Sequence, residues 1–131
     1  METKFNFNSQ VCTSKVQSER LLALGLKKET ADCHLEFYVD GTHNTWAQTI
    51  ESLDYPFNQG TQTGCIPAWS LHRLIEMMPN YIPNQGWFSL GHQGLHYSKG
   101  YGVADDGLYE SIIRMYEWLI KEGYFNKEYL E

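Results

Sequence analysis

The sequence predicts an α+β fold of two layers, in which a small, mostly antiparallel sheet of about four or five strands packs against three helices. Two pairs of short segments read as strands joined by glycine-containing turns, which indicates antiparallel hairpins. Segments with helical apolar spacing lie between them, so helices are expected to cover a face of the sheet. A chain of 131 residues supports one core, which predicts a single α+β domain over residues 1–131.

The first helix is expected shortly after Ser14. Ser14 and Gln17 have the spacing of a capping box, and Gly25 has the position of a left-handed C-terminal cap followed by the apolar Leu26. The side chains expected on its apolar side are Val16, Ala23 and Leu24, with Leu21 near the edge.

A hairpin is expected next. Residues 34–39 alternate, with Leu35, Phe37 and Val39 on one face, and Asp40-Gly41 is a strong turn signal. Residues 46–53 fit the returning strand better than a short helix, and residues 54–64 read as a loop. Residues 4–7 are a candidate edge strand.

The second helix is expected to open at Ile66-Pro67, since proline is favoured at the first helical position. It is expected to close at Pro79, because the residue before a proline disfavours helical geometry. Its apolar side is formed by Leu71, Leu74, Ile75 and Met78.

A second hairpin and the last helix complete the prediction. Residues 87–90 and 95–99 read as strands joined by Gly91–Gly94, after a connection over residues 80–86. Asp105 and Asp106 are expected to cap the third helix, which ends near Gly123. Its apolar stripe is Leu108, Ile112, Met115, Tyr116 and Leu119, and its expected ion pairs are Glu110–Arg114 and Glu117–Lys121.

Charge and cysteine content limit the partners and the compartment. Ten Lys and Arg against sixteen Asp and Glu give a net charge of −6, which disfavours duplex nucleic acid and anionic membranes as partners. No apolar run has the length of a membrane span, and the N-terminal residues do not resemble a secretory signal. With three widely spaced cysteines, these features predict a cytoplasmic protein with reduced thiols.

The spacing of the cysteines and histidines gives only weak support for a metal site or a catalytic nucleophile. Suitable ligand types are scattered over Cys12, Cys33, His34, Cys65 and His72, and His92 and His96 stand four apart, so we expect no metal site and no cofactor. Cys65 is the best nucleophile candidate, because a helix start after it would lower its thiol pKa. A small hydrolase or transferase using Cys65 or the two histidines stays open as an alternative, although no catalytic residue is predicted.

Aromatic residues carry the main functional signal. They make up 15% of the chain, and several gather near a cation and flexible glycines, as in sites that stack a planar ligand or anchor a protein partner. Trp69 and Trp118 fall away from the apolar sides of their helices, which predicts exposed tryptophans and self-association. The candidate ligand-binding or interface residues are Trp87, His92, His96, Tyr97, Lys99, Tyr101, Trp69 and Trp118.

Four segments carry a resemblance to other proteins: VCTSKVQSERLLALGL, TADC, IPAWSLHRLIEMMP and LYESIIRMYEWLIKEGY. Together they resemble a group of small uncharacterised proteins of gut Bacteroidetes and their phages, over most of the chain from Cys12 to Gly123. The resemblance implies a bacterial or phage cytoplasmic setting. No activity is established for the group, so it assigns no catalytic residue.

These observations predict a non-enzymatic binding protein that is homo-oligomeric and binds a small planar or anionic ligand. A phage-type sponge for a signalling nucleotide is the version implied by the resemblance. The alternative is an acidic interaction module that binds and inhibits a host protein, since acidic surfaces can occupy nucleic-acid-binding grooves.

Overall fold

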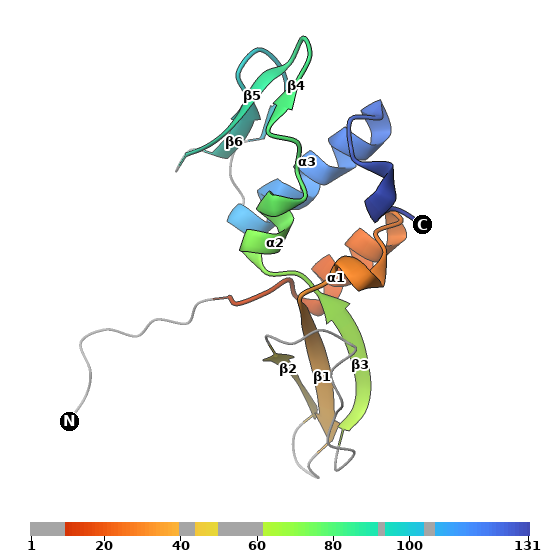
Figure 1. The fold of residues 1–131 in the computed structure, drawn as a ribbon. Helices are drawn as coiled ribbons and strands as arrows, with labels where there is room; N and C mark the ends of the chain where they lie inside the picture. The colour runs from red at the N-terminus through yellow and green to blue at the C-terminus, as the bar shows by residue number, and fades with distance from the viewer. Residues whose placement is uncertain (1–9, 40–43, 50–61, 92–93, 104–106) are drawn as a thin grey trace, which may run out of the picture.

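The fold is α+β, as predicted, but its strands form two sheets at opposite ends of a layer of helices (Figure 1). The computed structural model describes residues 10–39, 44–49, 62–91, 94–103 and 107–131, with residues 37–39, 44–49 and 62–64 described as backbone. Its elements are α1 (Lys15–Ala23), η1 (Lys28–Thr30), β1 (Cys33–Val39), β2 (Asn44–Thr49), β3 (Gln62–Ala68), α2 (Leu71–Glu76), β4 (Tyr81–Ile82), β5 (Gly86–Gly91), β6 (Gly94–Tyr97), β7 (Gly102–Val103), α3 (Leu108–Glu122) and η2 (Lys127–Tyr129).

The first sheet contains the predicted hairpin and one strand that was not predicted. β1 and β2 pair antiparallel, which confirms the returning strand, and the order is β2-β1-β3. β3 includes Ile66 and Pro67, which pair with Leu35 and His34, so the predicted helix start at Ile66-Pro67 is wrong. β3 is an edge strand, where one side of the backbone has no neighbouring strand and a proline is tolerated.

The second helix begins four residues later than predicted, at Leu71. Ser70 is its N-cap, and the Ser70 hydroxyl accepts a hydrogen bond of 3.1 Å from the Arg73 backbone N–H. The Asp32 carboxylate in turn accepts hydrogen bonds from the backbone N–H and the hydroxyl of Ser70, at 2.9 and 2.5 Å. A side chain from outside the helix therefore helps to fix its start, which local spacing cannot show.

The second sheet has the order β4-β5-β6-β7, and every pairing is antiparallel. The β5–β6 hairpin confirms the predicted pair of strands. β4 lies within the predicted connection over residues 80–86, where two paired residues are too few to give an alternating pattern.

The third helix supplies most of the core, as its stripe predicts. Ile112, Met115, Tyr116 and Leu119 are fully buried, whereas Leu108 at the first turn is exposed. Gly107 is the N-cap, and Gly123 closes the helix in the left-handed conformation with φ +80°.

The first helix has the predicted capping box but a different buried side. Ser14 and Gln17 make both reciprocal hydrogen bonds. Ser18 and Leu21 are the buried residues of α1, while Val16 is 64% exposed, so the expected apolar side is wrong. Ser18 is satisfied by a 2.7 Å hydrogen bond to the buried Thr13 hydroxyl, so a polar residue can occupy the inner side.

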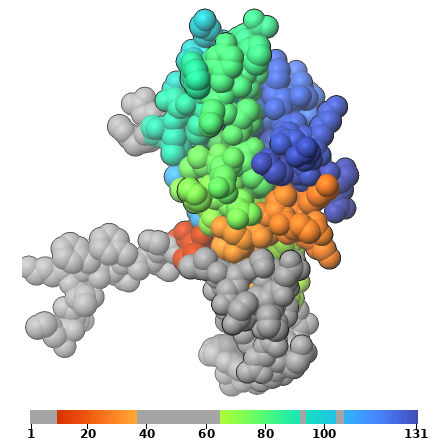
Figure 2. Space-filling view, viewed as in Figure 1, coloured from red at the N-terminus to blue at the C-terminus, as the bar shows by residue number. Residues whose placement is uncertain are grey.

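An ion pair between helices fixes α1 against α3. Arg20 of α1 contacts the carboxylates of Glu110 and Glu117 of α3 at 2.7 and 3.4 Å. Figure 2 shows α1 (orange), the segment around α2 (green) and the C-terminal segment (blue) packed into one body. Across the part of the chain that the structure describes, no helix is long and apolar enough to cross a membrane.

Several predicted features lie outside the described residues. They are the candidate edge strand at residues 4–7, the Asp40-Gly41 turn, the end of the returning strand at residues 50–53, residues 54–61 of the expected loop, and Asp105 and Asp106. The last three residues of the expected loop, 62–64, belong to β3, so this part of the loop prediction is wrong. The N-cap position of α3, expected for the aspartates, is occupied by Gly107.

Candidate functional site

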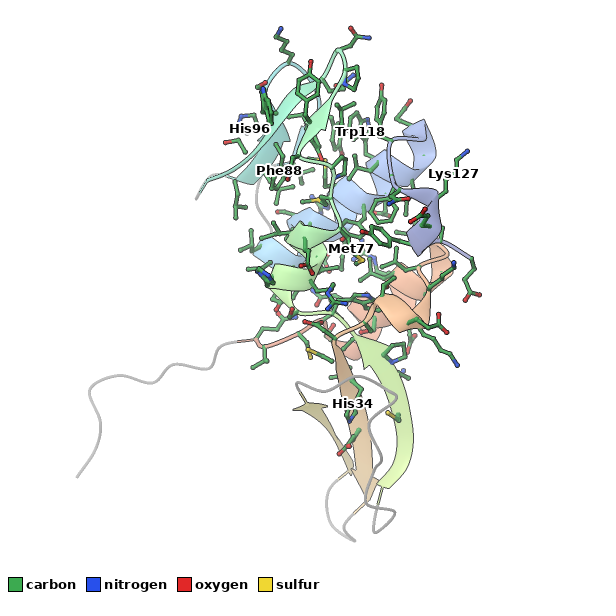
Figure 3. All side chains as sticks on the ribbon, in the orientation of Figure 1. His34, Met77, Phe88, His96, Trp118 and Lys127 are labelled. Carbon is green, nitrogen blue, oxygen red and sulfur yellow. The ribbon has the colours of Figure 1, made fainter. Side chains whose placement is uncertain are left out.

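The sheet β4-β5-β6-β7 has one face on the core and one face open to solvent. Phe88 pairs with Tyr97, and both belong to the face that packs toward α3. The next pair, Ser89 and His96, therefore projects to the opposite face, and both residues are exposed. Figure 3 labels Phe88 and His96, one from each face. We call the exposed side the outer face and define it by Tyr81, Trp87, Ser89, His96 and Gly102.

Two aromatic rings lie together at one end of the outer face. Tyr81 and Trp87 are paired across β4 and β5, and their ring centroids are 5.0 Å apart with an interplanar angle of 54°. Tyr81 is 51% exposed and Trp87 is 63% exposed. Large aromatic side chains with this exposure leave one ring face available to a planar partner.

The backbone under Trp87 is firmly held, although its side chain is exposed. The Trp87 N–H donates to the Ser98 hydroxyl at 3.1 Å, and the Ser98 N–H donates to the Trp87 carbonyl at 3.0 Å. The neighbouring Lys99 N–H donates to the Gln85 carbonyl at 2.6 Å. These bonds place the exposed Lys99 at the same end of the sheet as Tyr81 and Trp87.

His96 lies further along the outer face, between Ser89 and a glycine. Its partner on β7 is Gly102, and a Cβ at Gly102 would stand 3.0 Å from the His96 Cβ. The glycine therefore allows β7 to approach β6 closely at His96, where a side chain would be crowded. His96 can offer a ring N–H or an imidazolium charge to a ligand lying on this face.

The charge of this region differs from that of the rest of the chain. The net charge is −6, yet the segment from Met77 to Ala104, which holds the whole second sheet, contains no Asp or Glu. It contains Lys99 and two histidines. An anion on the outer face therefore meets no carboxylate from the strands beneath it.

The predicted site residues do not form one surface. His96, Lys99 and Trp87 belong to the exposed side or its rim, but Tyr97 is buried on the other face, where its hydroxyl donates to the Pro79 carbonyl at 2.8 Å. Burial raises the pKa of the Tyr97 phenol far above its usual range, so it stays a neutral donor in the core. His92 lies outside the described residues.

The two helix-associated tryptophans are not exposed as predicted. Trp69 precedes α2 and is fully buried, and its indole N–H donates to the Thr30 hydroxyl at 2.9 Å. Trp118 is partly buried beneath Tyr101, whose ring stacks on it at 4.7 Å with an interplanar angle of 9°. Thr30 of η1 and Tyr101 before β7 contact these two rings, and a helical wheel contains neither residue.

Tyr81 was missed by the sequence reasoning. The signal available was an aromatic residue two positions before the turn-like sequence Pro83-Asn84-Gln85-Gly86, but β4 is too short for its alternation to be recognised. Only the pairing with β5 brings Tyr81 beside Trp87.

The cysteine chemistry expected at Cys65 is not supported by its position. Cys65 lies in β3 opposite Glu36, and burial together with the Glu36 charge raises its thiol pKa to about 11. The thiol is therefore protonated at neutral pH, and the expected lowering by a helix start is wrong. Among the described residues, no group of three or more His, Cys, Asp or Glu side chains is arranged to hold a metal ion.

A cavity of about 350 Å³ lies elsewhere, between the end of α2 and the C-terminal segment. It is lined in part by Glu76, Met77, Asn80, Tyr124 and Tyr129, and it includes none of the predicted site residues. The Glu76 carboxylate at its wall makes it a poorer place for an anion than the outer face.

The outer face thus combines two aromatic rings, an imidazole and a nearby ammonium group on strands β4–β7, which contain no Asp or Glu. This set can stack a planar group and neutralise negative charge. Comparison with protein-family models, with curated proteins and with solved structures finds no match to this chain.

Proposed function

We propose that the protein is a non-enzymatic binding protein whose outer face binds a planar anionic small molecule of the nucleotide class. The observation that carries the proposal is the exposed Tyr81–Trp87 pair on a sheet whose strands contain no Asp or Glu. The rings supply stacking area, and His96 and Lys99 supply positive charge or N–H donors for a phosphate.

The energetics of stacking make this proposal measurable. One base on an aromatic side chain contributes about 1–3 kcal/mol, and a stacked purine with one charge contact gives only weak to moderate affinity in water. A sponge for a signalling nucleotide is the more specific form of the proposal, and it rests on the resemblance to the phage proteins.

Self-association is the second part of the proposal. Among the tryptophans whose side chains the structure describes, Trp69 is buried and Trp118 is covered by Tyr101, which leaves Trp87 for contact between copies. Aromatic anchors of this kind are enriched at interfaces between protein chains. Native mass spectrometry of the wild type and of Trp87→Ala tests this part, and a monomeric wild-type protein would overturn it.

The binding test distinguishes the contribution of the ligand's base from that of its phosphate. AMP and GMP are titrated into ¹⁵N-labelled protein, beside adenosine, which has no phosphate, and ribose 5-phosphate, which has no base. We expect amide shifts in β4, β5 and β6 with the nucleotides, weaker shifts with adenosine and the weakest with ribose 5-phosphate.

Matched variants locate the site. Trp87→Ala is expected to weaken nucleotide binding by about tenfold, from the loss of one stacking surface. His96→Ala is expected to weaken AMP binding more than adenosine binding. Val16→Ala, at an exposed apolar residue of α1, which packs on β3 and α3, serves as the control and should bind as the wild type does. Nucleotide shifts that persist unchanged in Trp87→Ala, or their absence at millimolar ligand, would refute the proposal.

A further inference from the structure

Two cysteines from distant parts of the sequence meet in the junction between the helices and the first sheet. Cys12 precedes α1, and Cys33 is the first residue of β1, where it pairs with Ala68 of β3. The Thr13 N–H donates to the Trp69 carbonyl at 2.9 Å, so the chain at Cys12 runs beside the end of β3. Cys12 and Cys33 belong to one small cluster of buried residues at this junction.

The surroundings isolate this pair of thiols. Cys12 and Cys33 are both fully buried, and they pack with Leu35 and Ala68 in a small apolar cluster. Cys65, the third cysteine of the chain, pairs with Glu36 and so projects from the opposite face of the sheet. Cys12 and Cys33 therefore have each other, and not Cys65, as a partner for a disulfide.

We propose that Cys12 and Cys33 form a reversible oxidation site, which a peroxide converts to a disulfide and a small thiol reductant restores. In the first step the Cys12 sulfur attacks one oxygen of hydrogen peroxide. The S–O bond forms, the O–O bond breaks, and the leaving hydroxide takes a proton to become water.

In the second step the Cys33 sulfur attacks the sulfur of the Cys12 sulfenic acid. The S–S bond forms, the S–O bond breaks, and the hydroxyl group leaves with the Cys33 proton as a second water. Two thiols are oxidised by two electrons in total, and one peroxide is reduced to two waters.

The environments of the two thiols differ, which favours Cys12 as the first nucleophile. The neighbouring Cys33 lowers the pKa of Cys12, against the opposing effects of burial and the Asp32 charge. The neighbouring Cys12, with burial, raises the pKa of Cys33. Cys12 is therefore the better first nucleophile and Cys33 the resolving thiol. Because both thiols are buried, we expect the reaction to be slower than that of an exposed thiol.

A disulfide here closes a loop that contains all of α1 and η1. Cross-linking a loop of this size restricts the unfolded chain, so oxidation should raise the Tm by roughly 5–10 °C. The Tm shift distinguishes a cross-link in the native geometry from one formed between unfolded chains.

The experiment uses the full-length reduced protein treated with hydrogen peroxide. We expect the intact mass to fall by about 2 Da, peptide mapping to show a Cys12–Cys33 linkage, and dithiothreitol to reverse both the mass change and the Tm shift. Cys65→Ser is the matched control and should form the same linkage, whereas Cys12→Ser and Cys33→Ser should not.

The peptide map of the wild-type protein shows whether the Cys12–Cys33 disulfide forms, even if the serine variants in this cluster do not fold. Linkages that include Cys65, sulfinic acid without a cross-link, or an unchanged mass after prolonged treatment would each overturn the proposal. This test does not depend on the outer face or on any bound ligand.

Discussion

The central strand of the first sheet is buried on both faces at one end, whereas β6 of the second sheet is buried on one face only. In β1, the consecutive residues Cys33, His34 and Leu35 are all buried, so both faces of the strand are covered at this end. In β6, the alternation is sharp, with Leu95 and Tyr97 buried and His96 between them exposed. A strand closed on both faces serves structure, whereas a strand closed on one face leaves a surface that can bind.

Two histidines show what this difference means chemically. His34 is fully buried, and its Nε2 lies 2.8 Å from the Glu36 carboxylate. His96 is exposed beside Gly102 and faces solvent. The same side chain is thus part of a buried polar pair in one sheet and an available donor in the other, and only the second is placed to meet a ligand.

The largest effect on stability is expected at Trp69, in the closed part of the molecule. Trp69→Ala should lower the free energy of unfolding by about 3–5 kcal/mol, because it removes a fully buried ring and leaves a cavity. Urea denaturation followed by circular dichroism measures the loss. Trp69→Phe is the control, which keeps a ring but loses the hydrogen bond to Thr30, and its loss should be smaller. A loss below about 1 kcal/mol for Trp69→Ala would contradict the buried assignment.

The two histidines give the next largest effect. His34→Gln should cost about 1–3 kcal/mol of folding free energy, because Glu36 loses a buried partner. His96→Gln should change it by less than about 0.5 kcal/mol, as is usual for an exposed side chain. The same denaturation measurement serves both variants, and equal losses would mean that the two sheets do not differ as described.

The ion pair that joins α1 to α3 should make the stability of the protein depend on pH. The hydrogen bond from Arg20 lowers the pKa of Glu110 below its ordinary value. A lowered folded-state pKa stabilises the protein above the unfolded pKa, and this contribution is lost as the pH falls through the folded pKa.

The pair is about one-third exposed, so solvent screening limits it, and Glu110→Gln should cost about 0.5–1 kcal/mol at pH 7. The difference from the wild type should shrink as the pH is lowered below about 4. Glu117→Gln, whose contact with Arg20 is 3.4 Å, is the weaker control. A difference that stays constant down to pH 3 would show that Glu110 acts through packing and not through its charge.

The smallest effect on stability is expected on the outer face. Trp87→Ala should change the free energy of unfolding by under about 1 kcal/mol, because the ring is 63% exposed and contacts mainly Tyr81. Thermal denaturation checks this value beside the binding titration. A large loss of stability would mean that Trp87 is part of the fold, and the loss of binding in this variant would then carry no weight for the site.

Prediction from sequence succeeded where the signal was local. The capping box at Ser14, the left-handed glycine at Gly123 and the apolar stripe of α3 depend on residues a few positions apart, and the structure has all three. It failed at Pro67, because a proline fits both a helix start and an edge strand, and only the pairing with β1 distinguishes them.

The candidate site was predicted in part, for a related reason. The cluster of aromatic residues in the second hairpin is visible in the sequence, and alternation along β5 and β6 separates His96 from Tyr97 once the strands are known. Tyr81 reaches Trp87 only through β4, and Trp69 and Trp118 are covered by segments that are distant in sequence or belong to loops. Exposure of a large side chain depends on these neighbours.

The sequence by itself determined the fold class, the capping box of α1, the C-terminal glycine of α3 and the second hairpin, because backbone hydrogen bonding and apolar spacing act within a few residues. The tertiary structure decided that the strands form two sheets, that Cys12 meets Cys33, and that an aromatic pair lies on an open face. Those features depend on contacts between segments far apart in the chain, whose geometry is set by the packing of the whole core.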